Sequence, residues 1–186
     1  MALSKIQSES INLADTFAFT GTVTGAGEST VESSKITLDS ASHSATGIPD
    51  GVREVHLLWS GVSTSAGNPG MHIQVGTSSG LVTSGYNSQY AYIYDSNTMA
   101  RAASSAGLEI GNWGAGIVMH GFASCFRTNG TDDLWIYHYF TTLYTDYAGQ
   151  LFGTGMIDLS APLDRIAMVC VTTGTFDAGT MQVLYR

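Results

Sequence analysis

Charged side chains are scarce in this sequence. Only 12% of the 186 residues are Asp, Glu, Lys or Arg, and Lys5 and Lys35 are the only lysines. Long surface helices need charged residues on their outer faces, so the composition excludes a mainly helical protein. The net charge of −8 also argues against capture of nucleic acid, because neutralising phosphates requires clustered Lys and Arg. We therefore expect a strand-rich protein with no nucleic-acid partner.

Long apolar runs and cysteine pairs are lacking as well. No run approaches the roughly 18 apolar residues of a membrane helix, and the N-terminus has no apolar core before a cleavage site. We expect neither membrane insertion nor processing. Cys125 and Cys170 stand in separate apolar segments and form no CxxC motif. Two free core thiols in a protein made in a reducing cytoplasm are expected, and a bridge between neighbouring strands is the alternative.

What the sequence does contain is apolar alternation with the two-residue period of strands. The predicted strands are Arg53–Val62, Met71–Gly76, Gln89–Asp95, Ile117–Thr128, Asp133–Tyr144, Met156–Leu159, Leu163–Thr173 and Gly179–Arg186. Turn residues at 129–133 predict a hairpin over 117–144, and Asp177–Gly179 predicts a turn before the last strand. Only Ser96–Gly107 has the composition of a short helix. The fold class is therefore all-β, an antiparallel two-sheet β-sandwich that is jelly-roll-like, with an extended N-terminal arm.

The arm is predicted to comprise residues 1–46, and the β-sandwich domain residues 47–186. Ser, Thr, Gly and acidic residues dominate the first segment, with Leu13, Phe17 and Phe19 as hydrophobic anchors. Such a segment cannot offset its own ordering entropy, so it is either disordered or laid along another surface, such as a neighbouring subunit. We interpret it as an attachment and oligomerisation segment that also has room for the first strands of the fold.

Catalytic and metal-binding motifs are absent from the sequence. The five histidines, at 43, 56, 72, 120 and 138, form neither HxH nor HExxH, so we assign no metal and no cofactor. Ser60, Ser124, Asp158 and Asp164 are the residues that a hydrolase could draw on. No GxSxG is present, and the Gly-rich stretches lack the Lys of a phosphate loop. We expect no catalytic residues and a protein that is not an enzyme.

Aromatic residues are arranged more distinctively. Tyr90, Tyr92 and Tyr94 share one face of a predicted strand, and Trp135, Tyr137 and Tyr139 share one face of another. Three interpretations are open. The rings pack inward in the core, they form a subunit interface, or they form a stacking platform for a host glycan, because flat rings with a polar edge match the face of a pyranose.

Both ends of the chain resemble a known class of proteins. The opening Met1–Ile6, the run FAFTGTVTGAG at Phe17–Gly27 and the ending Thr175–Arg186 resemble virion proteins of tailed bacteriophages, particularly small tail-fibre-like proteins of marine and cyanobacterial phages. The resemblance implies an N-terminal attachment segment, a compact all-β domain and a homotrimer located in the virion after assembly in the host cytoplasm. No coiled-coil or collagen-like shaft is present, so a short fibre is expected rather than a long one.

The resemblance implies a non-catalytic structural role. The leading hypothesis is a short tail fibre whose partners are other virion proteins and a host-surface glycan. The alternative is a capsid decoration, cement or head-fibre protein. A glycan-active tailspike enzyme is the third reading, and it would require Glu109, Asp158 and Asp164 to converge in one cleft.

Overall fold

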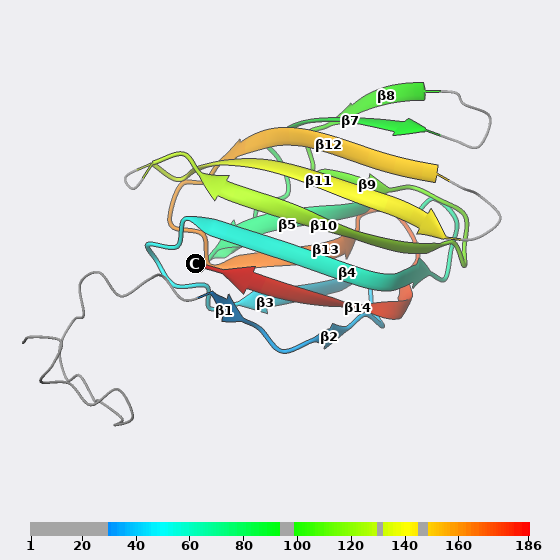
Figure 1. Ribbon diagram of the computed structural model, residues 1–186, viewed down its shortest axis with the longest axis horizontal. Helices are drawn as coiled ribbons and strands as arrows, with labels where there is room; N and C mark the ends of the chain where they lie inside the picture. Colours follow the sequence, from blue (N-terminus) through cyan, green and yellow to red (C-terminus); the bar gives the residue numbers. More distant parts are fainter. Residues whose placement is uncertain (1–29, 94–98, 130–131, 145–148) are drawn as a thin grey trace, which may run out of the picture.

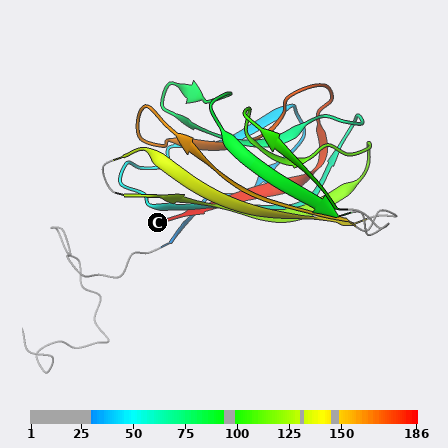
Figure 2. The same ribbon diagram turned by 90° about the horizontal axis from the view of Figure 1, so that it is seen from above.

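Two antiparallel β-sheets make up the folded part of the chain. The computed structural model describes residues 30–93, 99–129, 132–144 and 149–186. Sheet A has nine strands in the order β1-β14-β4-β10-β11-β12-β7-β8, with β2 also paired to β14. Sheet B has five, in the order β3-β13-β5-β6, with β9 also paired to β5. Sheet B lies behind sheet A as a second layer (Figures 1 and 2), which confirms the predicted all-β sandwich.

The strands of each sheet have the following bounds. Sheet A contains β1 (Val31–Glu32), β2 (Ile36–Thr37), β4 (Glu54–Thr64), β7 (Asn87–Ile93), β8 (Met99–Ser104), β10 (Val118–Arg127), β11 (Leu134–Tyr144), β12 (Gly149–Asp158) and β14 (Phe176–Tyr185). Sheet B contains β3 (Ser42–Thr46), β5 (Met71–Thr77), β6 (Gly80–Leu81), β9 (Leu108–Gly111) and β13 (Arg165–Cys170). No helix long and apolar enough to span a membrane occurs within the described ranges.

The central strands of sheet A follow from the apolar alternation. Val55, Leu57 and Trp59 on β4 are at most 3% exposed and face sheet B. The predicted hairpin is confirmed as β10 and β11, paired from Val118 with Tyr144 to Arg127 with Trp135. The inner residues of both sheets form one continuous hydrophobic core.

Two local predictions were wrong. The predicted helix at Ser96–Gly107 is strand β8 from Met99 to Ser104, paired with β7 along its length. So short a helix is marginal without tertiary support, and pairing with the edge of β7 satisfies the backbone instead. The predicted turn at Asp177–Gly179 lies inside β14, where two register shifts accommodate these residues. Gly179 adopts a positive φ of 101° there, so it permits a β-bulge rather than a chain reversal.

Part of the expected N-terminal arm lies in the sandwich. Within residues 30–46, β1 and β2 pair with β14, and β3 pairs with β13 over five residues. Residues 1–29 lie outside the described residues, and with them the anchors Leu13, Phe17 and Phe19. A truncation that spares every strand of the described residues must therefore end before Val31.

Candidate functional site

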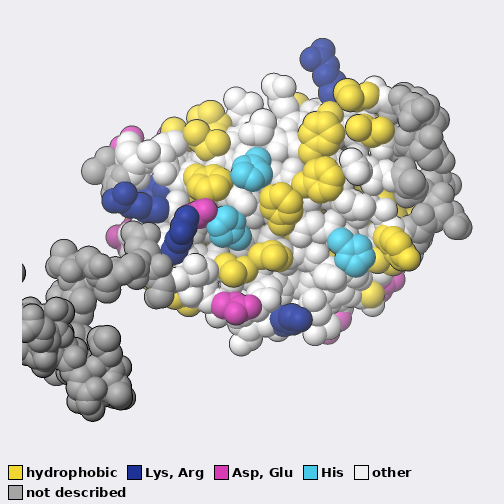
Figure 3. Space-filling model, viewed as in Figure 1, with side chains coloured by type: hydrophobic (Ala, Val, Ile, Leu, Met, Phe, Trp, Pro, Cys, Tyr) yellow, Lys and Arg dark blue, Asp and Glu magenta, His cyan; other side chains and the backbone are white. Residues whose placement is uncertain are grey.

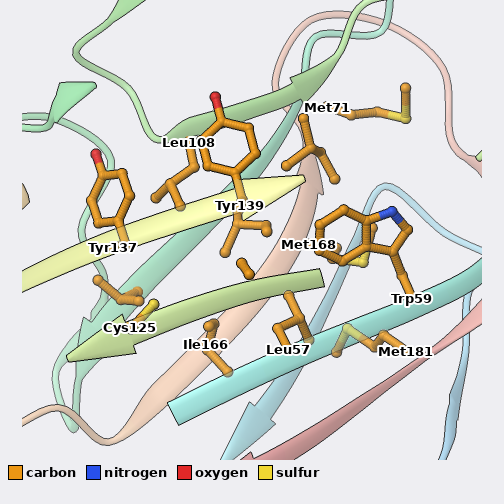
Figure 4. Packing of buried hydrophobic residues seen from close by; sticks show 14 of the residues in the cluster. Leu57, Trp59, Met71, Leu108, Cys125, Tyr137, Tyr139, Ile166, Met168 and Met181 are labelled. Carbon is orange, nitrogen blue, oxygen red and sulfur yellow. The ribbon is translucent and has the colours of Figure 1, made fainter. Parts of the chain in front are cut away.

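The aromatic row on β11 faces the core. Trp135, Tyr137 and Tyr139 are only 2%, 1% and 2% exposed, as the inward-packing interpretation requires. Figure 4 shows Tyr137 and Tyr139 side by side, rising from β11 toward Leu108 on β9. Room for the rings comes from Gly155 and Gly153, which pair with Tyr137 and Tyr139 on β12. A Cβ atom at either glycine would lie 2.5 Å from a tyrosine hydroxyl oxygen.

The tyrosines of β7 lie on the same inner face, nearer its margin. Tyr90 pairs with Gly153, and Tyr92 pairs with Leu151, so both point to the side on which Tyr139 points. They are half-buried rather than buried, because β9 is the edge strand of sheet B at this end. Tyr94 lies outside the described residues. The structure therefore divides the expected aromatic set into a buried group and an accessible pair.

The outer face of sheet A carries an apolar surface that single-strand patterns do not reveal. The register aligns Leu58, Phe122, Phe140 and Phe152 in one row across β4, β10, β11 and β12. It aligns Phe126, Ile136 and Met156 in a second row. We call these seven residues, with the histidines between them, the outer face of sheet A. Figure 3 shows hydrophobic side chains with histidines among them, spread over this side of the molecule.

The exposure of this surface is high for side chains of its type. Leu58, Phe122, Phe126, Ile136, Phe152 and Met156 are each 37–48% exposed. At roughly 200 Å² per large side chain, six such residues present about 500 Å² of apolar area. That is near the upper end for the largest patch of a monomeric protein, where such patches mark interaction sites.

Histidines occupy the row between the two apolar rows. His138 stacks on Phe126 with ring centroids 5.8 Å apart and meets Phe122 edge-on at 6.1 Å. His56 Nδ1 lies 2.8 Å from Ser124 Oγ, and its Nε2 lies 3.0 Å from Glu54 Oε1. A hydrogen bond from Arg186 to Glu54 is the largest influence that holds the pKa of this carboxyl below its usual range.

The chain Ser124–His56–Glu54 has the order of nucleophile, base and orienting carboxylate. A second pair, Ser60 Oγ and His120 Nδ1, lies 3.1 Å apart on the same two strands. Acyl transfer also needs backbone donors for the oxyanion, held in a site that excludes water. Around Ser124 the backbone groups of β10 are engaged with β4 and β11 on either side. At His120 the register with β4 shifts, and the Gly61 N–H donates to His120 Nδ1 instead. These pairs are therefore best described as cross-strand hydrogen bonds on a flat face.

The residues required by the sugar-cleaving interpretation do not all converge. Glu109 pairs with His72 near the start of β5, whereas the Asp164 N–H bonds to the Gly76 carbonyl near its end. Four residues of strand separate the two positions by about 13 Å. Asp164 instead forms an ion pair with Arg165 at 2.9 Å. In the described part of the chain, no three His, Cys, Asp or Glu residues are grouped so as to hold a metal ion.

The two cysteines are free thiols. Cys125 is buried on the inner face of sheet A, and burial raises the pKa of its thiol to about 12. Cys170 is half-buried at the end of β13, where burial raises the thiol pKa to about 11. Neither has the lowered pKa of a reactive cysteine.

No protein-family model matches the chain, and no curated protein matches its sequence.

Proposed function

We propose that this chain is a non-catalytic virion structural protein, a short tail fibre of a tailed bacteriophage. It attaches through its N-terminal segment and presents the β-sandwich for adsorption to the host surface. The proposal is supported by the resemblance of the two chain ends to such proteins. It is supported further by a sandwich that carries an extended apolar surface. A structural protein that acts only in an assembly needs such a surface, whereas a monomeric soluble protein does not.

The outer face of sheet A is the single observation that carries the proposal. Its area of about 500 Å² would supply most of the roughly 800 Å² that each partner buries in a standard interface. Its centre is apolar and aromatic, while the ion pair between Glu54 and Arg186 lies at one end. An apolar aromatic centre with charged residues displaced to the rim is the usual composition of a protein interface.

A second copy of the chain is the partner proposed for this face. A flat apolar sheet is matched by another flat apolar sheet, as in the packing of a sandwich core. In the homotrimer we propose, each copy turns the outer face of sheet A toward the three-fold axis. On all three copies the described chain then enters the domain at β1.

Sedimentation of the purified full chain tests this assembly. We expect a species of three times the 19.6 kDa chain mass. Leu58→Ser and Phe122→Ser should each weaken the trimer, because they remove apolar area from the face. Val171→Ser is the matched control, since Val171 is 41% exposed, close to the 43% of Leu58, but follows β13 in the other sheet. A wild-type monomer at every concentration, or equal weakening by the control, would contradict the proposal.

A further inference from the structure

A small pocket lies at the margin of the sandwich, distinct from the outer face of sheet A. It has a volume of about 160 Å³. Its walls come from three parts of the chain: β7, β9 with the segment after it, and β12. The lining residues are Tyr90, Tyr92, Glu109, Asn112, Trp113 and Leu151. It opens where the inner face of sheet A extends past the edge strand of sheet B.

Three aromatic rings shape the pocket. Tyr92 and Trp113 meet edge to face, with centroids 6.1 Å apart and an angle of 88° between the ring planes. Tyr90 lies next to Tyr92 at 6.4 Å, with the planes inclined by 34°. The rings therefore present flat walls in two directions. Such walls pack against flat, partly apolar ligands and leave their polar edges free.

The polar groups of the pocket are held in place by the fold. Glu109 is anchored through its backbone, because the Tyr139 hydroxyl donates a 2.8 Å hydrogen bond to the backbone carbonyl oxygen of Glu109. Its side chain is 18% exposed and lies 3.9 Å from His72 Nε2. Burial, followed by the neighbouring Glu109 carboxylate, raises the pKa of Tyr90, so this hydroxyl stays protonated as a donor.

Asn112 supplies hydrogen-bond donors, whereas the Glu109 carboxylate is an acceptor. Its Oδ1 accepts the Gly70 N–H at 3.1 Å, which fixes the orientation of the amide. The amide N–H groups have no partner among the described residues and remain available as donors. A fixed acceptor and a fixed donor beside aromatic walls match a ligand with adjacent hydroxyl groups, each of which both donates and accepts.

Charge and size narrow the ligand class. Among the described residues, no Lys or Arg lines the pocket, and Glu109 repels phosphate, sulfate and carboxylate groups. A purely apolar ligand would displace water from the Glu109 carboxylate and add no hydrogen bond to the one that Tyr90 donates, which is costly. The volume is below the roughly 300 Å³ at which sites for drug-sized ligands begin, so it suits one ring.

We propose that this pocket binds a single neutral pyranose unit, such as the terminal residue of a host-surface glycan. One ring face packs on the aromatic walls, while two hydroxyl groups bond to Glu109 and Asn112. The role of the glycan in adsorption rests on the proposed virion function. The binding of the sugar rests only on the pocket.

Titration with methyl glycosides tests the pocket directly. The probes are the methyl glycosides of glucose, galactose and N-acetylglucosamine, with methyl glucuronide as the anionic probe. Binding is followed by saturation-transfer NMR and by the fluorescence of the protein. We expect at least one neutral glycoside to bind and the glucuronide to bind more weakly. Weak sites of this kind have dissociation constants of about 1 mM, so each probe is tested up to about 50 mM. Absence of binding by all three neutral probes at that concentration, or preference for the anion, would overturn the proposal.

Conservative variants locate the binding. Glu109→Gln keeps the shape of the side chain and removes its charge, and Asn112→Ala removes an exposed amide; each should weaken binding about tenfold. Gln89→Ala is the matched control, because Gln89 is exposed on β7 and points to the opposite face from Tyr90. Unchanged affinity in both pocket variants, with unchanged melting temperature, would place the sugar elsewhere and refute the assignment.

The same samples keep the two proposals apart. Sedimentation of Glu109→Gln reports the assembly through the outer face of sheet A, which the substitution does not touch. Loss of sugar binding with an intact trimer is the expected result. A wild-type trimer that binds no neutral glycoside overturns the pocket alone, and a monomer that binds sugar overturns the assembly alone.

Discussion

Gly153→Ala should destabilise the sandwich, because the Tyr139 ring lies across this glycine. An added Cβ would stand 2.5 Å from the Tyr139 hydroxyl oxygen and 2.7 Å from the Gln89 carbonyl oxygen. Both distances are below van der Waals contact, and the carbonyl belongs to a paired strand that cannot yield locally. Overpacking of this kind costs about 1–3 kcal/mol. For a chain of this size the melting temperature should fall by roughly 2–12 °C.

Gly67→Ala is the control for the same chemical change. The nearest atoms to a Cβ at Gly67 are 3.8 Å away or more, which is ordinary contact. Both variants remove a glycine and its extra freedom in the unfolded chain, so the difference between them isolates the clash. Urea unfolding followed by tryptophan fluorescence gives the midpoint and slope of each variant. Equal midpoints for the two variants would show that Tyr139 does not lie against Gly153.

Three further predictions concern titration, thiol reactivity and salt. Burial lowers the pKa of His72 below its usual value of 6.5, so the fold favours the neutral ring and the free energy of unfolding should fall as the pH drops below about 6.5. His72→Gln should flatten that pH dependence. If urea midpoints between pH 7.5 and 5 change with the same slope in the wild type and the variant, the burial of His72 is contradicted. Cys170 is half-buried with a raised thiol pKa, so it should react slowly with a thiol reagent in the native protein. Cys125, at 1% exposure, should react only on unfolding, and equal native rates for the two thiols would refute its buried position. Trimer formation should persist in high salt, because apolar contacts rather than ion pairs hold the proposed interface, and dissociation at 1 M NaCl in the ultracentrifuge would count against it.

Local alternation made the central strands predictable. Arg53–Val62 and the hairpin over 117–144 have the two-residue apolar period, and the structure contains β4, β10 and β11 at these places. Strands whose apolar alternation is weaker were not predicted from the sequence. Most of β12 precedes the predicted strand at Met156–Leu159, because glycines at 149, 153 and 155 interrupt the pattern. Gly153 and Gly155 leave room for the β11 tyrosines, and Gly149 leaves room for Leu143, so the interruptions answer a tertiary requirement.

The two candidate surfaces depend on register between distant strands. A pattern along β11 separates Ile136 from Trp135, but it does not show which face is covered. The row from Leu58 to Phe152 exists only once four strands are aligned. The pocket likewise joins Tyr90 to Glu109 through the crossing from β8 to β9, in a region where the sequence predicted a helix. The tyrosines of β7 and Glu109 were singled out in the sequence, but nothing there placed them together.

The location of the protein on a virus particle tests the central claim most directly. Antibody raised against the sandwich, visualised with gold on intact phage particles, reports that location without depending on either candidate surface. We expect gold at the tail, in the low copy number of a fibre. Gold spread over the head would contradict the fibre and favour the decoration protein. If the same antibody detects the protein in infected cells but particles carry no gold, a virion role is contradicted altogether.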